Sequence, residues 1–302
     1  MKIYDLIIIG AGPAGLTSAL YAARYRLDVL VISTILGGTM PEAHKVWNFP
    51  SYNEISGIEL TKKMYEQIKN LNVEIKNEIV TSIEKKKETF EIKTQKNSYQ
   101  SKKVIITSGR EKAKLNLKNE EKFLGKGIHY CATCDSTFYK NKIVAVVGGG
   151  NSAMSAALLL GGYAKKVYVI YRGTELKNAE KMLVEQVKNN KKIEFIFNVN
   201  VVELIGKDNL ESIKLSSDKK LALDGLFIEV GSLPNKEIFK KLKLEYEKDF
   251  IKVNNKQETD IKGIFAAGDV TNNPLKQIIT ACGEGAIAAY SVYLEIQQNL
   301  ER

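Results

Sequence analysis

The stretch Gly10-Ala11-Gly12-Pro13-Ala14-Gly15 decides the fold of this chain. Its glycines follow the pattern G-x-G-x-x-G, directly after the apolar run 4–9 and before the helical pattern 16–24. In a dinucleotide-binding turn of this kind, the first glycine makes the bend, the second lets backbone amides approach a pyrophosphate, and the third lets the helix pack on the strand. Together with the next apolar run, 29–32, the stretch predicts a strand, a tight turn, a helix and a second strand.

A second unit of the same kind lies within residues 143–171. Gly148, Gly150 and Ala153 have the form G-x-G-x-x-A, and they follow the apolar run 143–147. Because this pattern again stands between a predicted strand and a predicted helix, it implies a second dinucleotide.

The end of this second unit carries positive charge. Arg172, rather than an acid, follows the predicted strand 167–171, and Lys177 is nearby. A cation at this place suits the 2′-phosphate of NADP, so NADPH is favoured over NADH. The alternative is that Arg172 is an ordinary exposed residue at a strand end.

The remaining apolar runs complete a plan of two nucleotide-binding halves in tandem. Short alternating runs between the two units predict a small antiparallel meander that returns to the main sheet. The predicted segments are the meander strands 78–83, 89–94 and 104–107, the helix 151–160 ended by Gly161 and Gly162, the strands 167–171, 193–197, 225–230 and 264–267, the linker 231–235, and a closing helix 275–297.

A C-x-x-C pair, Cys131 and Cys134, lies between the two glycine-rich turns. Such a pair is either half of a zinc site or a redox pair. Zinc would need two more ligands, and apart from carboxylates the chain offers only Cys282, His44 and His129, with no second pair at ligand spacing. Redox chemistry is therefore favoured. A disulfide in so tight a loop can accept two electrons and then attack another disulfide as a thiolate.

Three residues near the pair or elsewhere in the chain have alternative interpretations. Asp135, next to Cys134, is a candidate general acid or base, although a helix N-cap or a solvated carboxylate is nearly as well supported by the local sequence. His129 could tune a thiolate, but a lone histidine near a loop favours a structural role. Cys282 is expected to pack as a small buried hydrophobic residue and is assigned no chemistry.

Composition and charge exclude several classes of protein. No run approaches about 18 uninterrupted apolar residues, so no membrane-spanning helix is expected. Three cysteines do not suit the disulfide framework of a secreted scaffold, and a cytoplasmic location is expected. The formal net charge of +10 would suit an acidic partner, but the lysines are spread without the stacking aromatics of a nucleic-acid groove. Nucleic acid is therefore not an expected partner.

Taken in their order along the chain, these motifs resemble those of the low-molecular-weight thioredoxin reductases. The resemblance extends from Tyr4 to about Tyr293. It rests on the two glycine-rich turns and on the following shorter motifs: Cys131-Ala132-Thr133-Cys134-Asp135, Gly37-Gly38, Asn48-Phe49-Pro50, Gly109, Ala266-Ala267-Gly268-Asp269-Val270 and Gln277.

The resemblance implies an α/β fold with two Rossmann-like, three-layer nucleotide-binding domains and small antiparallel β-meanders. Residues 1–111 and 238–302 would form a discontinuous FAD-binding domain. Residues 112–237 would form an inserted pyridine-nucleotide-binding domain that carries the two cysteines. The family is homodimeric, so a homodimer is also expected.

The resemblance also implies a set of binding residues. FAD would lie along the first glycine-rich stretch, with Asn48 near the ring, Asp269 on the ribitol and Gln277 near the isoalloxazine. The residues expected to bind FAD are Gly10, Gly12, Pro13, Ala14, Gly15, Gly37, Gly38, Asn48, Gly109, Gly268, Asp269 and Gln277. Those expected to bind NADPH are Gly148, Gly150, Asn151, Ser152, Ala153, Arg172 and Lys177.

In the reaction that the resemblance implies, electrons pass from NADPH through FAD to Cys131 and Cys134, and then to the disulfide of thioredoxin or a thioredoxin-like protein. Cys134 would lie nearer the flavin. Cys131, Cys134 and Asp135 are therefore the expected catalytic residues.

This sequence departs from the family where the electron donor should bind. The family's H-R-R-x-x-x-R run is replaced by Tyr171-Arg172-Gly173, with Lys177 near the last arginine position. Because a lysine does not replace the planar fork of an arginine towards phosphate, the preference for NADPH is weakened, and NADH or reduced ferredoxin stay open as donors. Two further alternatives are a ferredoxin–NADP reductase-like flavoenzyme, which has no need of the cysteine pair, and a redox sensor that does not turn over.

Overall fold

The computed structural model describes residues 2–43, 45–177 and 179–300. The chain divides into two compact units. Unit 1 contains Met1–Glu111 and Leu233–Arg302, and unit 2 contains Lys112–Ser232.

The two segments that connect the units are short strands. They are β7 (Glu111–Lys112) and β16 (Ser232–Leu233), and they pair with each other. Part of the segment 231–235, which the sequence predicts to be a linker, is therefore a strand. The second crossing follows Ser232, earlier than the expected boundary after residue 237.

Unit 1 is built on a sheet whose central strands are parallel. β1 lies between β2 and β6 in the order β3-β2-β1-β6, and β19 pairs with the end of β6. The bounds are β1 (Ile3–Ala11), β2 (Val29–Leu36), β3 (Glu74–Lys76), β6 (Ser98–Ile106) and β19 (Ile264–Ala266). Parallel strands are buried on both faces, which explains why the stretch 6–9 reads as a continuous apolar run rather than an alternating one.

An antiparallel meander extends this sheet, as the sequence predicts. β4 (Val80–Lys85) pairs with β5 (Phe90–Thr94), and β5 pairs with the first half of β6. The second half of β6 runs parallel to β1, so this one long strand joins the meander to the nucleotide-binding sheet.

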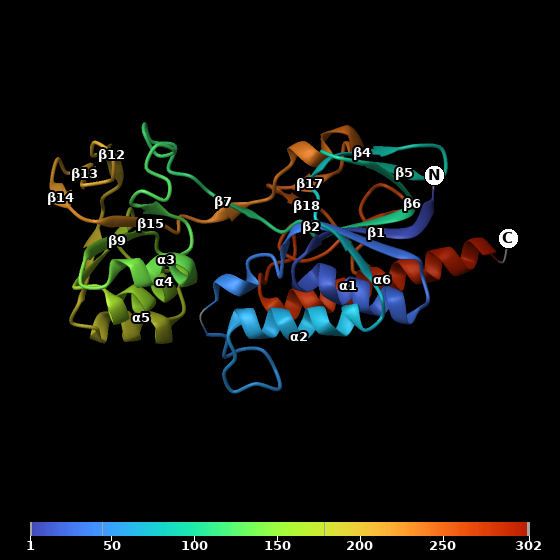
Figure 1. Ribbon diagram of the computed structural model, residues 1–302, viewed down its shortest axis with the longest axis horizontal. Helices are drawn as coiled ribbons and strands as arrows, with labels where there is room; N and C mark the ends of the chain where they lie inside the picture. Colours follow the sequence, from blue (N-terminus) through green and yellow to red (C-terminus); the bar gives the residue numbers. More distant parts are fainter. Residues whose placement is uncertain (1, 44, 178, 301–302) are drawn as a thin grey trace. The chain divides into compact units, whose positions relative to one another are not determined.

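Helices cover one face of the unit 1 sheet. α1 (Pro13–Arg24), α2 (Gly57–Lys69) and α6 (Ile278–Leu300) lie together on that side (Figure 1). Leu6 and Ile8 of β1 point toward them and are fully buried. Complete burial of an aliphatic side chain contributes about 1.5–3 kcal/mol, so this layer is a main source of stability for the turn between β1 and α1.

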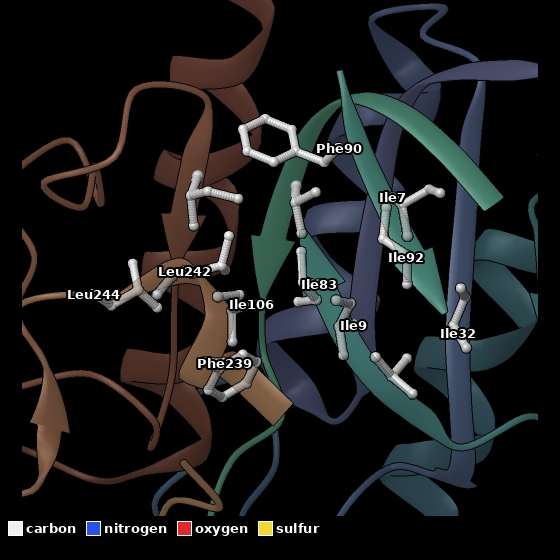
Figure 2. Close-up of a cluster of buried hydrophobic side chains, with 14 of the residues drawn as sticks. Ile7, Ile9, Ile32, Ile83, Phe90, Ile92, Ile106, Phe239, Leu242 and Leu244 are labelled. Carbon is white, nitrogen blue, oxygen red and sulfur yellow. The ribbon is translucent and has the colours of Figure 1, made fainter. Parts of the chain in front are cut away.

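The opposite face of the sheet packs against the meander and a 3-10 helix, η3 (Glu237–Leu242). Ile7 and Ile9 alternate with the residues of the first face, and they belong to a cluster with Phe90 of β5 and Phe239 of η3 (Figure 2). Unit 1 thus has three layers, helices, parallel sheet and meander, in agreement with the predicted fold class.

Unit 2 repeats the plan on a smaller scale. Its parallel sheet has the order β11-β10-β9-β15-β8, and a separate antiparallel meander has the order β12-β13-β14. The strands are β8 (Ile128–His129), β9 (Ile143–Val147), β10 (Lys166–Tyr171), β11 (Ile193–Phe197), β12 (Val201–Ile205), β13 (Ser212–Leu215), β14 (Lys220–Ala222) and β15 (Gly225–Ile228), and the helices are α3 (Ala132–Asp135), η2 (Ser136–Tyr139), α4 (Asn151–Tyr163) and α5 (Lys181–Asn189).

Gly161 and Gly162 do not end α4, contrary to the prediction. The helix continues to Tyr163. A Cβ atom on Gly161 would lie 2.7 Å from the side-chain nitrogen of Asn190, which follows α5. Gly161 therefore serves the close packing of α4 rather than its termination.

Two other helix ends differ from the prediction. α1 begins at Pro13 rather than at residue 16, because proline suits the first turn of a helix. The last helix begins at Ile278, so Gln277 lies just before it.

The elements of unit 1 not described so far are η1 (Met40–Glu42), β17 (Tyr246–Glu247) and β18 (Phe250–Ile251). Among the described helices, none is both long and apolar enough to cross a membrane.

Candidate active site

The first glycine-rich turn is shaped by close backbone contacts. Gly10 has a φ of +108°, and a Cβ atom there would lie 2.3 Å from the carbonyl oxygen of Thr107. A Cβ atom on Gly15 would lie 2.0 Å from the carbonyl oxygen of Gly10. At Gly12, by contrast, the nearest atom to such a Cβ is 3.9 Å away. Packing thus requires the first and third glycines, while the second leaves space beside the start of α1.

Gly37 and Gly38, which follow β2, contact this turn. The backbone N–H of Gly37 donates to the carbonyl oxygen of Ala11 at 2.7 Å. Gly38 has a φ of +59°, and a Cβ atom there would lie 3.2 Å from the Cα atom of Gly12. The structure therefore brings together two motifs whose contacting residues are 26 positions apart in the sequence.

The motif 266–270 also lies beside the first glycine-rich turn. Gly268 has a φ of +80°, and its Cβ position lies 3.0 Å from the Cβ atom of Ala14. On α6, a Cβ atom on Gly285 would lie 2.3 Å from the carbonyl oxygen of Ala14. The start of α1, including Pro13 as its first residue, is therefore in direct contact with the segment that carries Asp269.

Two side-chain pairs join distant parts of unit 1 at this site. The amide nitrogen of Asn48 donates to Oε1 of Gln277 at 3.0 Å. Arg110, which follows Gly109, donates to Oδ2 of Asp269 from Nε at 3.0 Å and from Nη2 at 2.6 Å. The Arg110 contact was not anticipated from the sequence.

Two partly buried charged residues, Glu284 and Lys276, interact with Asp269. Burial raises the pKa of Glu284 in α6, and the backbone N–H of Gly268, which donates to its Oε2 at 2.6 Å, partly opposes that rise. Burial lowers the pKa of Lys276, while Asp269 and Glu284 oppose that change. Opposite charges thus compensate one another around a partly buried carboxylate.

The residues of this part of unit 1 fit a dinucleotide, such as the FAD that the resemblance implies. The N–H groups in the first turn of α1 have no partner within the helix, and with the open space at Gly12 they suit a pyrophosphate. Ser108, next to Gly109, carries a buried hydroxyl oxygen that has no hydrogen-bond partner within the described ranges. A buried hydroxyl without a partner is costly, so a bound group at this place would satisfy it.

In unit 2, Cys131 and Cys134 form a disulfide with their Cα atoms 5.3 Å apart. Cys131 caps the N-terminus of α3, and its sulfur accepts the backbone N–H of Cys134 at 3.2 Å. Cys134 is exposed and Cys131 is half-buried. The exposure of Cys134 leaves this face of the disulfide open to a reaction partner.

Asp135 follows the disulfide and is tied to a buried pair. Its Oδ2 lies 2.7 Å from Nδ1 of His129, whose Nε2 lies 2.6 Å from the hydroxyl of Tyr139. Burial is the first cause that raises the pKa of Tyr139 to about 12. His129 was expected to be structural, and its contact with Asp135 shows a direct connection to the neighbourhood of the cysteines.

The second glycine-rich turn repeats part of the geometry of the first. Gly148 has a φ of +148°, and a Cβ atom there would lie 2.2 Å from the carbonyl oxygen of Glu229. Gly150 has open space around its Cβ position and caps α4, of which Ala153 is fully buried. The side chain of Asn151, at the start of α4, exchanges two hydrogen bonds with Glu180.

Comparison with known proteins agrees with this geometry. The family model described as pyridine nucleotide-disulphide oxidoreductase matches residues 4–285. A thioredoxin reductase of Bacillus subtilis (strain 168) is 38% identical, over 99% of this chain and 98% of that protein. The crystal structure of Lactococcus lactis thioredoxin reductase matches with a TM-score of 0.93 at 34% identity, over 98% of this chain and 99% of that one. This chain belongs to the thioredoxin reductase family.

Membership of the thioredoxin reductases identifies the chain as an oxidoreductase, and the Cys131–Cys134 disulfide fits the redox-active pair of such an enzyme. The comparisons do not favour the ferredoxin–NADP reductase-like alternative. One further structural relative is described as a ferredoxin-flavin thioredoxin reductase from Clostridium acetobutylicum, with 38% identity, a TM-score of 0.55 and coverage of 98% of both chains.

The residues that distinguish this thioredoxin reductase near the second turn are Tyr171, Arg172 and Lys177. The ring of Tyr171 lies against two glycines, so that a Cβ atom would come within 2.4 Å of it at Gly149 and within 2.8 Å at Gly173. Arg172 is exposed. Lys177 pairs with Glu175 at 3.8 Å, and both side chains are largely exposed.

Lys177 also lines a surface hollow of about 420 Å³ beside α5, together with Leu176, Val184 and Phe197. Arg172 is not among the residues that line this hollow. The structure therefore does not show the two predicted phosphate-binding cations converging on one place. Ser152, in the first turn of α4, is exposed.

Cys282 lies on α6 and is partly buried, and its burial raises the pKa of its thiol. His44, one of the ligands considered for zinc, lies outside the described residues. In the ranges that the structure does describe, no group of three or more His, Cys, Asp or Glu side chains is arranged to hold a metal ion.

Proposed function

We propose that this thioredoxin reductase passes electrons from NADPH through FAD and the Cys131–Cys134 disulfide to the disulfide of thioredoxin or a thioredoxin-like protein. The observation that carries the proposal is the cysteine pair itself, which is bonded, partly exposed, and followed by a carboxylate. Family membership adds the thioredoxin reductase activity of the relatives.

FAD would be held by unit 1. The proposed contacts are the pyrophosphate at Gly10–Gly15 and Gly37–Gly38, the ribitol at Asp269, and the ring near Asn48 and Gln277. When bound, FAD supplies two-electron reduction of a disulfide. Arg110 would have to share Asp269 with the ribitol, because it already donates two hydrogen bonds to that carboxylate.

The cysteines and Asp135 would then act in thiol–disulfide exchange. Two electrons open the Cys131–Cys134 bond, and one proton converts the resulting pair into a thiol and a thiolate. The thiolate attacks one sulfur of the partner disulfide, and the partner's other sulfur leaves with the electron pair. The second cysteine then attacks the enzyme sulfur of the mixed disulfide, the partner sulfur leaves as a thiolate, and the Cys131–Cys134 bond is restored. Asp135 would accept and return the proton in these steps.

NADPH would bind at the second glycine-rich turn. The open position at Gly150 and the start of α4 at Asn151, Ser152 and Ala153 support a pyrophosphate there. Arg172 and Lys177 are the proposed contacts to the 2′-phosphate, although Lys177 would first have to leave Glu175.

A different electron donor is the second candidate, and one observation supports it. The ring of Tyr171 lies against the glycine-rich turn, at Gly149. The resemblance calls for a smaller histidine there, so the tyrosine leaves less room for a dinucleotide. The relative from Clostridium acetobutylicum that is described as a ferredoxin-flavin thioredoxin reductase is 38% identical over 98% of this chain.

Anaerobic reduction of the purified flavoprotein distinguishes these donors. NADPH, NADH and reduced ferredoxin are each mixed with the enzyme, and bleaching of the visible flavin absorbance is followed. Rapid bleaching by NADPH alone, with turnover when thioredoxin is added, would support the proposal. Bleaching by ferredoxin but by neither nicotinamide would contradict the NADPH assignment and leave only the dithiol half of the mechanism. A redox sensor would show no turnover with any donor.

We further propose that the enzyme is a homodimer located in the cytoplasm.

The formal net charge of +10 suits a partner protein that is acidic, because opposite charges accelerate encounter. The salt dependence of the rate with thioredoxin tests this point, since an attraction between opposite charges weakens as salt is added.

A further inference from the structure

His129 connects the carboxylate beside the redox cysteines to a buried hydroxyl. Its Nδ1 lies 2.7 Å from Oδ2 of Asp135, and its Nε2 lies 2.6 Å from the hydroxyl of Tyr139. The His129 ring is stacked on Phe227 at 5.2 Å between centroids, and the residue is only 8% exposed. Both ring nitrogens are therefore engaged, and the ring is held in one orientation.

The surroundings of Tyr139 determine which ring nitrogen carries the proton. Burial, with added effects of Asp135 and Asp224, raises the pKa of Tyr139 to about 12, so its hydroxyl stays protonated near neutral pH. The ammonium of Lys142 lies 5.5 Å from the centre of the Tyr139 ring. A protonated hydroxyl can donate to Nε2, and the proton on Nδ1 then faces the Asp135 carboxylate.

We propose that His129 is a positioning residue that holds Asp135 as a carboxylate with one oxygen free for the cysteine pair. This inference rests on the proposed role of Asp135 in exchange. The Nδ1–H bond stabilises the charged form of Asp135 and fixes the orientation of the carboxylate. When the reduced pair attacks a disulfide, Asp135 takes the proton of the attacking thiol. The enzyme sulfur bonds to one substrate sulfur, and the other leaves as a thiolate, to which the proton can return.

The test isolates the dithiol half of the reaction. The FAD-containing enzyme is reduced with dithiothreitol, freed of excess reductant, and mixed with the aromatic disulfide 5,5′-dithiobis(2-nitrobenzoate) over a range of pH. Release of the coloured thiolate gives the rate. No nicotinamide, ferredoxin or thioredoxin takes part, so the result does not depend on the donor or the protein partner.

A pair of variants of similar shape separates hydrogen bonding from packing. His129→Leu removes the donor to Asp135, whereas His129→Asn places an amide nitrogen near the position of Nδ1. His129→Leu removes the hydrogen bond that favours the carboxylate form of Asp135, so we expect the acidic limb of the pH–rate profile to move upward by about one unit. The rate below the limb should fall about tenfold, and the rate above it should be unchanged. His129→Asn should keep the limb near its native position.

Several outcomes would overturn the inference. A limb that does not move in His129→Leu, or moves equally in His129→Leu and His129→Asn, would assign His129 a packing role only. A shift that persists in the Asp135→Asn background would show that His129 does not act through Asp135. If His129→Leu does not fold, Tyr139→Phe, which removes only the hydroxyl, should give a smaller shift in the same direction, and an unmoved limb there would refute the inference.

Failure of the proposed function would give a different set of rates. If the aromatic disulfide is reduced with a limb that depends on His129 while thioredoxin is not reduced, the partner assignment fails and the inference about His129 is supported.

Discussion

A methyl group added at Gly12 should separate flavin binding from folding. Gly12 caps α1 with an extended backbone, and the nearest atom to an added Cβ lies 3.9 Å away. Gly12→Ala should therefore cost the apoprotein only about 0.5–1 kcal/mol, the loss expected when alanine replaces a better N-cap residue. The added methyl group would occupy the space that we assign to the pyrophosphate. We expect the dissociation constant for FAD to rise tenfold or more, which corresponds to about 1.4 kcal/mol.

Gly10→Ala is the contrasting variant. Its backbone has a φ of +108°, and the added Cβ would lie 2.3 Å from the carbonyl oxygen of Thr107. The unfavourable backbone conformation costs about 1–3 kcal/mol and the overpacking costs about 1–3 kcal/mol more. Because a domain is stable by only about 5–15 kcal/mol, this variant should lose much of the stability of unit 1 with or without flavin.

Urea unfolding of both apoproteins, followed by circular dichroism, measures stability, and flavin titration measures affinity. Gly162→Ala, a substitution in open space within α4, is the control and should retain both properties. The reasoning would be refuted if Gly12→Ala binds FAD with native affinity, or if it destabilises the apoprotein as much as Gly10→Ala does.

Three further predictions concern the cysteines, the electron donor and acid stability. Cys134→Ser should abolish thioredoxin reduction while the flavin is still reduced by its donor, as shown by bleaching without turnover; measurable turnover would count against the dithiol mechanism. The double variant Arg172→Ala with Lys177→Ala should raise the KM for NADPH about tenfold relative to that for NADH, and an unchanged ratio in steady-state assays would argue against a 2′-phosphate site at these residues. Hydrogen bonds from Lys241 and Lys86 lower the pKa of Glu84 from 4.5 to about 2. The contribution of this carboxylate to stability is therefore complete above pH 4.5 and is lost as the pH falls toward 2. Glu84→Gln should flatten the unfolding free energy over that range of pH, and a profile identical to that of the native protein would contradict this expectation.

The elements that followed from the sequence are those whose pattern is set by local chemistry. The run 4–9 and the glycines after it gave the first strand and turn, because a buried parallel strand and a tight turn each have a distinct residue pattern. The antiparallel meander also followed from alternation. α2 was missed, although Ser56 accepts the backbone N–H of Glu59 and the two residues have the spacing of a capping box.

Other details depend on tertiary contacts that no local pattern reports. Gly161 has the composition of a helix end, yet it allows close packing beside Asn190. Arg110 could not be paired with Asp269 from the sequence, since 159 positions separate them and only the folded sheet brings them together. His129 and Asp135 are six positions apart, but their contact requires the chain to turn from β8 into α3.

These differences indicate where sequence departures from the family should matter most. Contacts of Gly10, Gly15 and Gly148 with backbone carbonyls are set by main-chain geometry, so almost any side chain there disrupts the turn itself. The proposed electron-donor site depends instead on side chains, namely Tyr171 against Gly149 and the exposed Arg172. Side chains can change without changing the fold. It follows that donor specificity can differ between thioredoxin reductases that share one architecture, and that Tyr171→His is the substitution with which to look for a change in donor preference.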